Sequence, residues 1–167
     1  MPNVRLLLVA ALGLFLMHGS LAAQQQTRDQ MAGTWALVSV DTVGADGARK
    51  PTYGPDPKGL LILDGSGHYS LQIRRATLKK IASNNRLQTT PEEDKAVVEA
   101  LISHFGTYSF DPASKTLTLD VETSSFPNWD GVEQKRAVTF AGNEFKMVNP
   151  AASGGGGSAE LIWRRLN

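Results

Sequence analysis

The stretch GTWALVSV, residues 33–40, places a tryptophan two residues after a glycine at the start of the first predicted strand. Side chains alternate across a strand, so Trp35 and Leu37 share one face. The chain ends on a similar pattern, LIWRRLN at 161–167, in which Trp163 is followed by two arginines. We predict from this similarity between the two ends that the first and last strands meet and close a small β-barrel.

Short, alternating, β-branched segments separated by Gly, Pro, Asn and Asp make up most of the chain between these two ends. They cover residues 33–43, 59–64, 67–76, 106–111, 115–123, 132–141, 143–149 and 159–166. The turns DGSG at 64–67, DPASK at 111–115 and AGN at 141–143 join neighbouring segments as hairpins. This pattern predicts an all-β fold, an eight-stranded antiparallel up-and-down β-barrel.

One segment, TPEEDKAVVEALISHF at 90–105, has the pattern of a helix. Thr90 is placed to cap its start, and Glu93 completes a capping box. An apolar stripe follows at four-residue spacing: Val97, Leu101 and Phe105. A single helix cannot form its own layer, so we expect it to pack across the barrel. His104 would then lie at the negative end of the helix dipole, which favours its protonated form.

The first residues have the pattern of a secretory signal peptide, with Arg5 ahead of an apolar run at 6–17. That run is shorter than the roughly 20 residues of a membrane-spanning helix. We therefore predict a signal peptide at 1–23, a short lead at 24–32 and a single barrel domain at 33–167. The mature protein would be periplasmic or secreted, with no membrane span after cleavage.

The composition excludes several classes of function. The chain has 17 basic and 16 acidic residues, with no basic patch of the kind that a nucleic-acid site needs. It has no cysteine, and its histidines show no metal-binding spacing. No phosphate-binding loop or dinucleotide fingerprint is present, and DGSGH at 64–68 is a turn without the strand–helix context of a nucleophile elbow. We expect no metal, no cofactor and no nucleic-acid partner.

The segment at 132–141 is the most informative about the barrel interior. One face carries the side chains Val132, Gln134, Arg136, Val138 and Phe140. The three apolar members orient Gln134 and Arg136 inward. A buried guanidinium stays charged and needs a partner. An ion pair with Asp41 or Glu122 and an acidic ligand both remain open for Arg136.

Other residues are candidates for contact with a ligand in the lumen. Arg75 shares a strand face with Tyr69, Tyr108 follows in a later strand, and Trp129 lies in the loop SSFPNWDGVE. We place the tyrosines and Trp129 near the barrel mouth. Each also has a packing alternative, because aromatic side chains most often fill a core. His104 and Tyr108 are the candidates for a proton donor if the cavity is catalytic.

Taken in order, the segments GTWALVSV, PKGLLILDGSGHYSLQI, HFGTYSFD, FPNWDGVEQKR and LIWRR resemble the bacterial and fungal lipocalin-like domain family of the calycin superfamily. The resemblance covers residues 33–166. It implies that Gly33 and Trp35 form a Gly-x-Trp motif at the closed end of the barrel. Arg164 or Arg165 would pack on the Trp35 ring, next to Trp163, where the chain ends meet.

The resemblance and the residues together predict an exported barrel that binds a small, partly apolar molecule in its lumen, with Arg136 fixing an acidic or polar head. Two alternatives stay open. One is a cofactor-free isomerase or cyclase that uses the same cavity. The other is an envelope interaction module whose barrel is filled by its own side chains.

Overall fold

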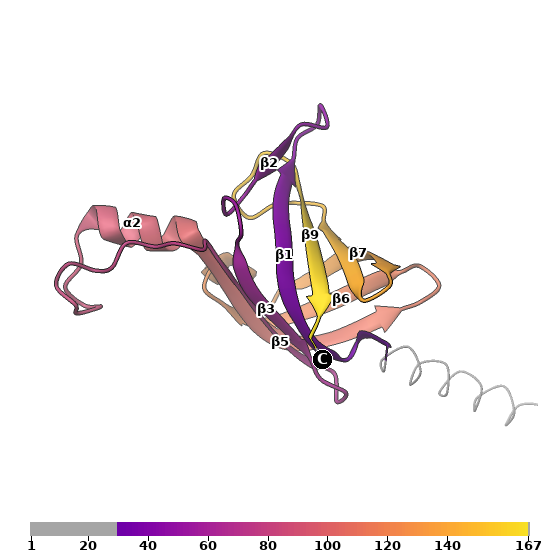
Figure 1. Cartoon of the computed structure of the whole chain (residues 1–167). Helices are drawn as coiled ribbons and strands as arrows, with labels where there is room; N and C mark the ends of the chain where they lie inside the picture. The colour runs from indigo at the N-terminus through magenta and orange to yellow at the C-terminus, as the bar shows by residue number, and fades with distance from the viewer. Residues whose placement is uncertain (1–29, 167) are drawn as a thin grey trace, which may run out of the picture.

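A computed structural model describes residues 30–166 of the chain (Figure 1). Its strands are β1 (Gly33–Val43), β2 (Arg49–Pro51), β3 (Lys58–Leu63), β4 (His68–Arg74), β5 (Leu101–Asp111), β6 (Thr116–Ser124), β7 (Glu133–Ala141), β8 (Glu144–Asn149) and β9 (Ser158–Arg165). The helices are α2 (Pro91–Ala100) and the short 3-10 helix η1 (Pro127–Trp129). The predicted signal peptide lies outside the described residues.

The sheet closes through β1. Its first half pairs with β3, its other edge pairs along its length with β9, and β3 to β9 follow one another as antiparallel neighbours. The short strand β2 continues the β3 edge of β1 beyond the barrel proper. The prediction of a closed, eight-stranded, antiparallel up-and-down barrel is confirmed, and the first and last strands do meet.

The up-and-down topology gives the barrel two distinct ends. Tight turns close one end: the β3–β4 turn at 64–67, the β5–β6 turn and the β7–β8 turn. The longer connections, including the segment that carries α2, the loop with η1 and the β8–β9 loop at 150–157, gather at the other end. Because short turns leave no room for a mouth, the second end is the open one.

Aromatic packing plugs the closed end. The rings of Trp35 and Phe145 meet edge to face at 4.6 Å, and Trp163 is fully buried beside them. The guanidinium of Arg165 lies 4.2 Å from the centre of the Trp35 ring and donates a 2.7 Å hydrogen bond to the Ala32 carbonyl. Arg165 is therefore the arginine that stacks on Trp35. Arg164 points outward and pairs with Glu144.

Glycine is required at position 33, where the Arg165 guanidinium lies against the backbone. Gly33 has a φ of 144°, and a Cβ atom there would lie 2.3 Å from an Nη atom of Arg165. Both the backbone conformation and the space exclude a larger residue. The Gly-x-Trp sequence thus serves the closure directly, since the glycine admits the guanidinium that covers the tryptophan.

The helix is shorter than predicted and is placed differently. It ends at Ala100, and residues 101–105 begin β5 instead of completing the helix. It also does not pack across the barrel. Residues 75–100 form an arm that projects to one side of the open end, with α2 as its returning half (Figure 1). The capping box of Thr90 and Glu93 is present as expected.

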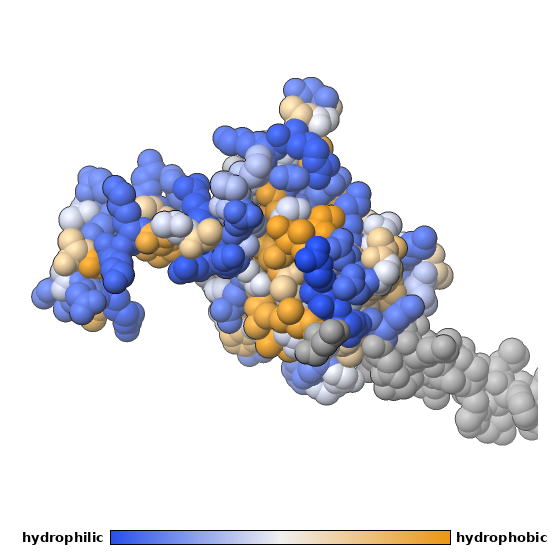
Figure 2. Space-filling model, viewed as in Figure 1, coloured by the Kyte–Doolittle hydropathy of each residue, from blue (hydrophilic) through white to orange (hydrophobic). Residues whose placement is uncertain are grey.

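The outer surface of the barrel and the surface of the arm differ in character. Hydrophobic surface appears over the barrel face that carries β1 and β3, where Val38, Leu60 and Ile62 are exposed, whereas the arm is mainly hydrophilic (Figure 2). None of the helices within residues 30–166 has the length and apolar character that crossing a membrane requires.

Candidate functional site

A cavity of about 60 Å³ occupies the open half of the lumen. Four polar or aromatic side chains reach it from different elements: His104 of β5, Trp129 of η1, Arg136 of β7 and Asn149 of β8. The loop residues Thr52 and Tyr53 line its outer side, and the rest of the wall is aliphatic or small: Val40, Leu71, Ile73, Ile102, Met147, Ala152, Ser153, Gly154, Ala159 and Leu161.

The size of this cavity limits what can enter it. One water molecule needs roughly 10–15 Å³ of such space, so the cavity has room for a few waters or for one small functional group. Cavities that enclose a whole drug-sized ligand measure about 300–1,000 Å³. The closed half of the lumen is filled by side chains, with Leu61, Leu63, Leu117 and Phe145 at most 1% exposed.

Arg136 lies inside the barrel and is 5% exposed. Its Nη2 atom donates to Oε1 of Gln134, which is also buried, and its guanidinium lies 5.9 Å from the centre of the Trp129 ring. Burial lowers the pKa of Arg136 to about 10, which still leaves the group charged at neutral pH. A positive charge therefore faces the cavity from the β7 wall.

No carboxylate in the described part of the chain forms an ion pair with Arg136. The expected pair with Asp41 or Glu122 is wrong, because Asp41 binds Arg49 on the outside and Glu122 is exposed on the outer face of β6. A buried, unpaired charge costs several kcal/mol. The neutral side chain of Gln134 accepts a hydrogen bond from Arg136 and does not neutralise its charge.

His104 belongs to β5 and not to a helix end, which corrects the sequence-based placement. It is 5% exposed, and its Nδ1 atom lies 2.8 Å from the hydroxyl oxygen of Tyr69. Burial, together with the nearby charge of Arg136, lowers the pKa of His104 to about 4. The ring is therefore neutral at physiological pH, the opposite of the protonated helix cap expected from the sequence.

Tyr69 and Trp129 complete one polar and aromatic cluster with His104. The Tyr69 and Trp129 rings both contact the His104 ring edge to face, with centroids 5.4 Å and 5.6 Å away. Burial raises the pKa of Tyr69 above its usual value, so its hydroxyl remains protonated. The cluster can offer or accept a hydrogen bond, or hold a proton, beside the Arg136 charge.

The remaining predicted residues lie elsewhere. The placement of both tyrosines near the mouth is wrong. The Tyr108 hydroxyl donates a 2.7 Å hydrogen bond to the Asp64 carbonyl in a closed-end turn. Tyr69 is the second residue of β4 after that turn, is 3% exposed and does not line the cavity. Gln134 is buried behind Arg136 and does not line the cavity. Arg75 lies outside the lumen, at the base of the arm.

Asn149 and Tyr53 also line the cavity, and neither was predicted from the sequence. Asn149 has the inward parity of Phe145 and Met147 in β8, so extending that alternation by one step would have found it. Tyr53 lies in the proline-rich loop after β2, where no periodicity indicates direction, yet it is 9% exposed and lines the cavity. Burial raises the pKa of its phenol.

A closed eight-stranded antiparallel barrel with one plugged end and a small cavity at the other belongs to the class of small up-and-down β-barrels. The family model of the lipocalin-like domain matches residues 32–166, and the chain belongs to that family. No curated protein matches the chain.

Proposed function

We propose that this protein is an exported carrier that binds a small, partly apolar acid, with the acid group held by Arg136 in the lumen. The observation that carries the proposal is the buried guanidinium that faces a cavity and lacks a carboxylate partner among the described residues. A bound carboxylate, sulfonate or phosphate would neutralise this charge. Export rests on the signal-peptide pattern of residues 1–23.

The cavity chemistry supports an acid head rather than a neutral one. Arg136 can present two N–H groups to a planar acid. The neutral His104 and the Asn149 amide lie on the same cavity and supply further polar contacts. The aliphatic wall suits the first carbons next to the acid group. The ligand enters through the open end, since the closed end is plugged by Trp35 and Trp163.

The test uses dansylaminoundecanoic acid, a fluorescent fatty-acid analogue, and its neutral methyl ester as the matched probe. Each is titrated into wild-type, Arg136→Met and Arg136→Lys protein, with folding checked by near-ultraviolet circular dichroism. A charged hydrogen-bonded contact is worth about 1.5–3 kcal/mol, so Arg136→Met should weaken acid binding roughly tenfold to hundredfold. Ester binding should change less than twofold, and Arg136→Lys should fall between the two.

An equal effect of Arg136→Met on acid and ester would refute acid recognition. Absence of binding by both probes would favour the filled barrel as an interaction module, provided that native mass spectrometry of the protein from its own host also shows a bare chain. A ligand mass that is lost on denaturation would identify the acid itself.

The Tyr69–His104 contact favours one second candidate, an isomerase or cyclase in the same cavity. The Tyr69 hydroxyl oxygen and Nδ1 of His104 lie 2.8 Å apart, within the hydrogen-bond reach that proton transfer needs. Turnover of the acid recovered from the host, abolished by His104→Gln while binding is retained, would distinguish this enzyme from a carrier.

A further inference from the structure

A second cavity, of about 600 Å³, lies directly outside the lumen. One wall is the C-terminal part of α2, with Val97 and Val98. The facing wall comes from the barrel mouth, with Tyr53, Ile102 and Phe126. We call this space the vestibule. The vestibule and the lumen cavity have five wall residues in common, Thr52, Tyr53, Ile102, Ser153 and Gly154, so the two spaces adjoin at the barrel mouth.

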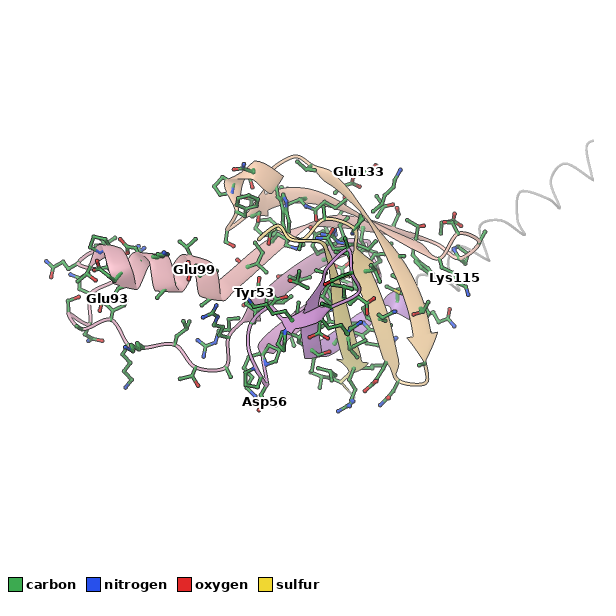
Figure 3. The ribbon with its side chains drawn as sticks, turned by 90° about the horizontal axis from the view of Figure 1, so that it is seen from above. Tyr53, Asp56, Glu93, Glu99, Lys115 and Glu133 are labelled. Carbon is green, nitrogen blue, oxygen red and sulfur yellow. The ribbon has the colours of Figure 1, made fainter. Side chains whose placement is uncertain are left out.

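The arm at residues 75–100 creates the vestibule. Arg74 and Leu101 are directly paired partners of β4 and β5, and Arg75 N–H donates a 2.9 Å hydrogen bond to the Ala100 carbonyl. A tight hairpin could therefore join these strands, but the chain makes a long excursion instead. Figure 3 shows α2 projecting from the barrel, with Glu99 at the barrel side, Glu93 at the far side and Tyr53 at the junction.

The arm has its own internal support. The Glu93 carboxylate accepts hydrogen bonds from the backbone N–H groups of Ala82 and Thr90, which ties the outgoing segment to the start of α2. Val98 is nevertheless 75% exposed and faces the vestibule. An apolar side chain on the wall of a space next to the lumen cavity is suited to contact an apolar molecule.

The volumes of the lumen cavity and the vestibule suit different parts of one ligand. The lumen cavity of about 60 Å³ accepts a slim acid head, and the vestibule is ten times larger. We propose that the vestibule binds the bulky apolar body of the acid whose head is held by Arg136, which makes the arm a specificity element. This inference rests on the proposed function. The ligand class is an elongated acid with a narrow head and a wide apolar body.

The experiment compares two residues of the arm that are almost equally exposed, Val98 at 75% and Leu87 at 77%. Leu87 is absent from the vestibule wall and serves as the matched control. Val98→Gln, Leu87→Gln and the conservative Val98→Leu are titrated with dansylaminoundecanoic acid and with its methyl ester. Gln is a good helix former, and the far-ultraviolet circular dichroism of each variant checks that the helical signal is retained.

Val98→Gln should weaken binding of both probes at least threefold, because the vestibule contacts the apolar body whether or not the head is charged. Leu87→Gln should leave both affinities within 1.5-fold of wild type, and Val98→Leu should retain binding. An unchanged affinity of Val98→Gln for both probes, or an equal loss in Leu87→Gln, would overturn the inference.

The outcome for Arg136→Met separates this inference from the proposed function. If only Arg136→Met weakens binding of the acid probe, acid recognition stands and the binding role of the vestibule is refuted. If only Val98→Gln weakens the probes, the vestibule binds an apolar body and the acid-binding role of Arg136 fails.

Discussion

Acidification should destabilise this barrel through His104. The ring is buried against Tyr69 and close to the charge of Arg136, and its pKa falls from 6.5 to about 4. In the unfolded chain the same ring titrates near 6.5. Between these two values the unfolded state binds more protons than the folded state, so stability falls as the pH falls.

The size of the effect follows from the two pKa values. One pKa unit corresponds to about 1.4 kcal/mol, so the neutral ring contributes about 3 kcal/mol of stability in full above pH 6.5 and none below about pH 4. Between pH 7 and pH 4.5 the loss from His104 alone should be about 2–3 kcal/mol. The total stability of a domain is usually about 5–15 kcal/mol, so this loss is readily measured.

Urea unfolding at pH 7 and pH 4.5, followed by tryptophan fluorescence, measures the loss in wild-type, His104→Gln and His68→Gln protein. Carboxylates whose pKa is lowered by hydrogen bonds also lose stability in acid, but all three proteins share them: Asp64, Glu93 and Asp111. Wild type should therefore lose about 2–3 kcal/mol more than His104→Gln. His68 is exposed, and His68→Gln should follow wild type. Equal losses in wild type and His104→Gln would refute the burial argument.

Five further substitutions test the rest of the structure by urea unfolding at pH 7. Arg165→Met removes the stacking on Trp35 and a charged hydrogen bond and should lower the free energy of unfolding by about 2–4 kcal/mol. Arg164→Met breaks an exposed ion pair and should lower it by less than about 1 kcal/mol. Equal losses would contradict the role of Arg165 in closing the barrel end. Gly106→Ala places a Cβ atom 2.0 Å from a backbone oxygen and should cost about 3 kcal/mol, while a Cβ atom at Gly65 meets nothing within 4 Å, so Gly65→Ala should stay within about 0.5 kcal/mol of wild type. Arg136→Met should raise the free energy of unfolding by about 1–4 kcal/mol, and a large decrease would assign Arg136 a structural role.

The barrel itself could be predicted because its signals are local. Period-two alternation, hairpin turns and the matching aromatic ends are all properties of short segments. The direction of Arg136 also followed from the parity of its strand, and the arginine is buried as that parity required. The missing carboxylate could not be foreseen, since it depends on where distant strands place Asp41 and Glu122.

The boundary between α2 and β5 shows how a polar residue at an inward position can hide the pattern of a strand. Ile102, His104, Gly106 and Tyr108 alternate as inward positions of one strand. A polar histidine and a glycine interrupt the apolar alternation, while Val97, Leu101 and Phe105 imitate a helical stripe. The helical period was therefore extended too far, and the histidine that lines the cavity was placed at a helix end.

The distribution of polar residues along the barrel axis argues that the open half is adapted to bind. Inward positions near the closed end are apolar, and Leu61, Leu63, Leu117 and Phe145 fill that half completely. Inward positions near the mouth include Arg136, His104 and Asn149, each buried and each less favourable for folding than an aliphatic residue. Local rules of packing are usually broken at functional sites. A methionine at position 136 would avoid the cost of burying a charge, so the buried guanidinium supports the proposal that this position binds an acid.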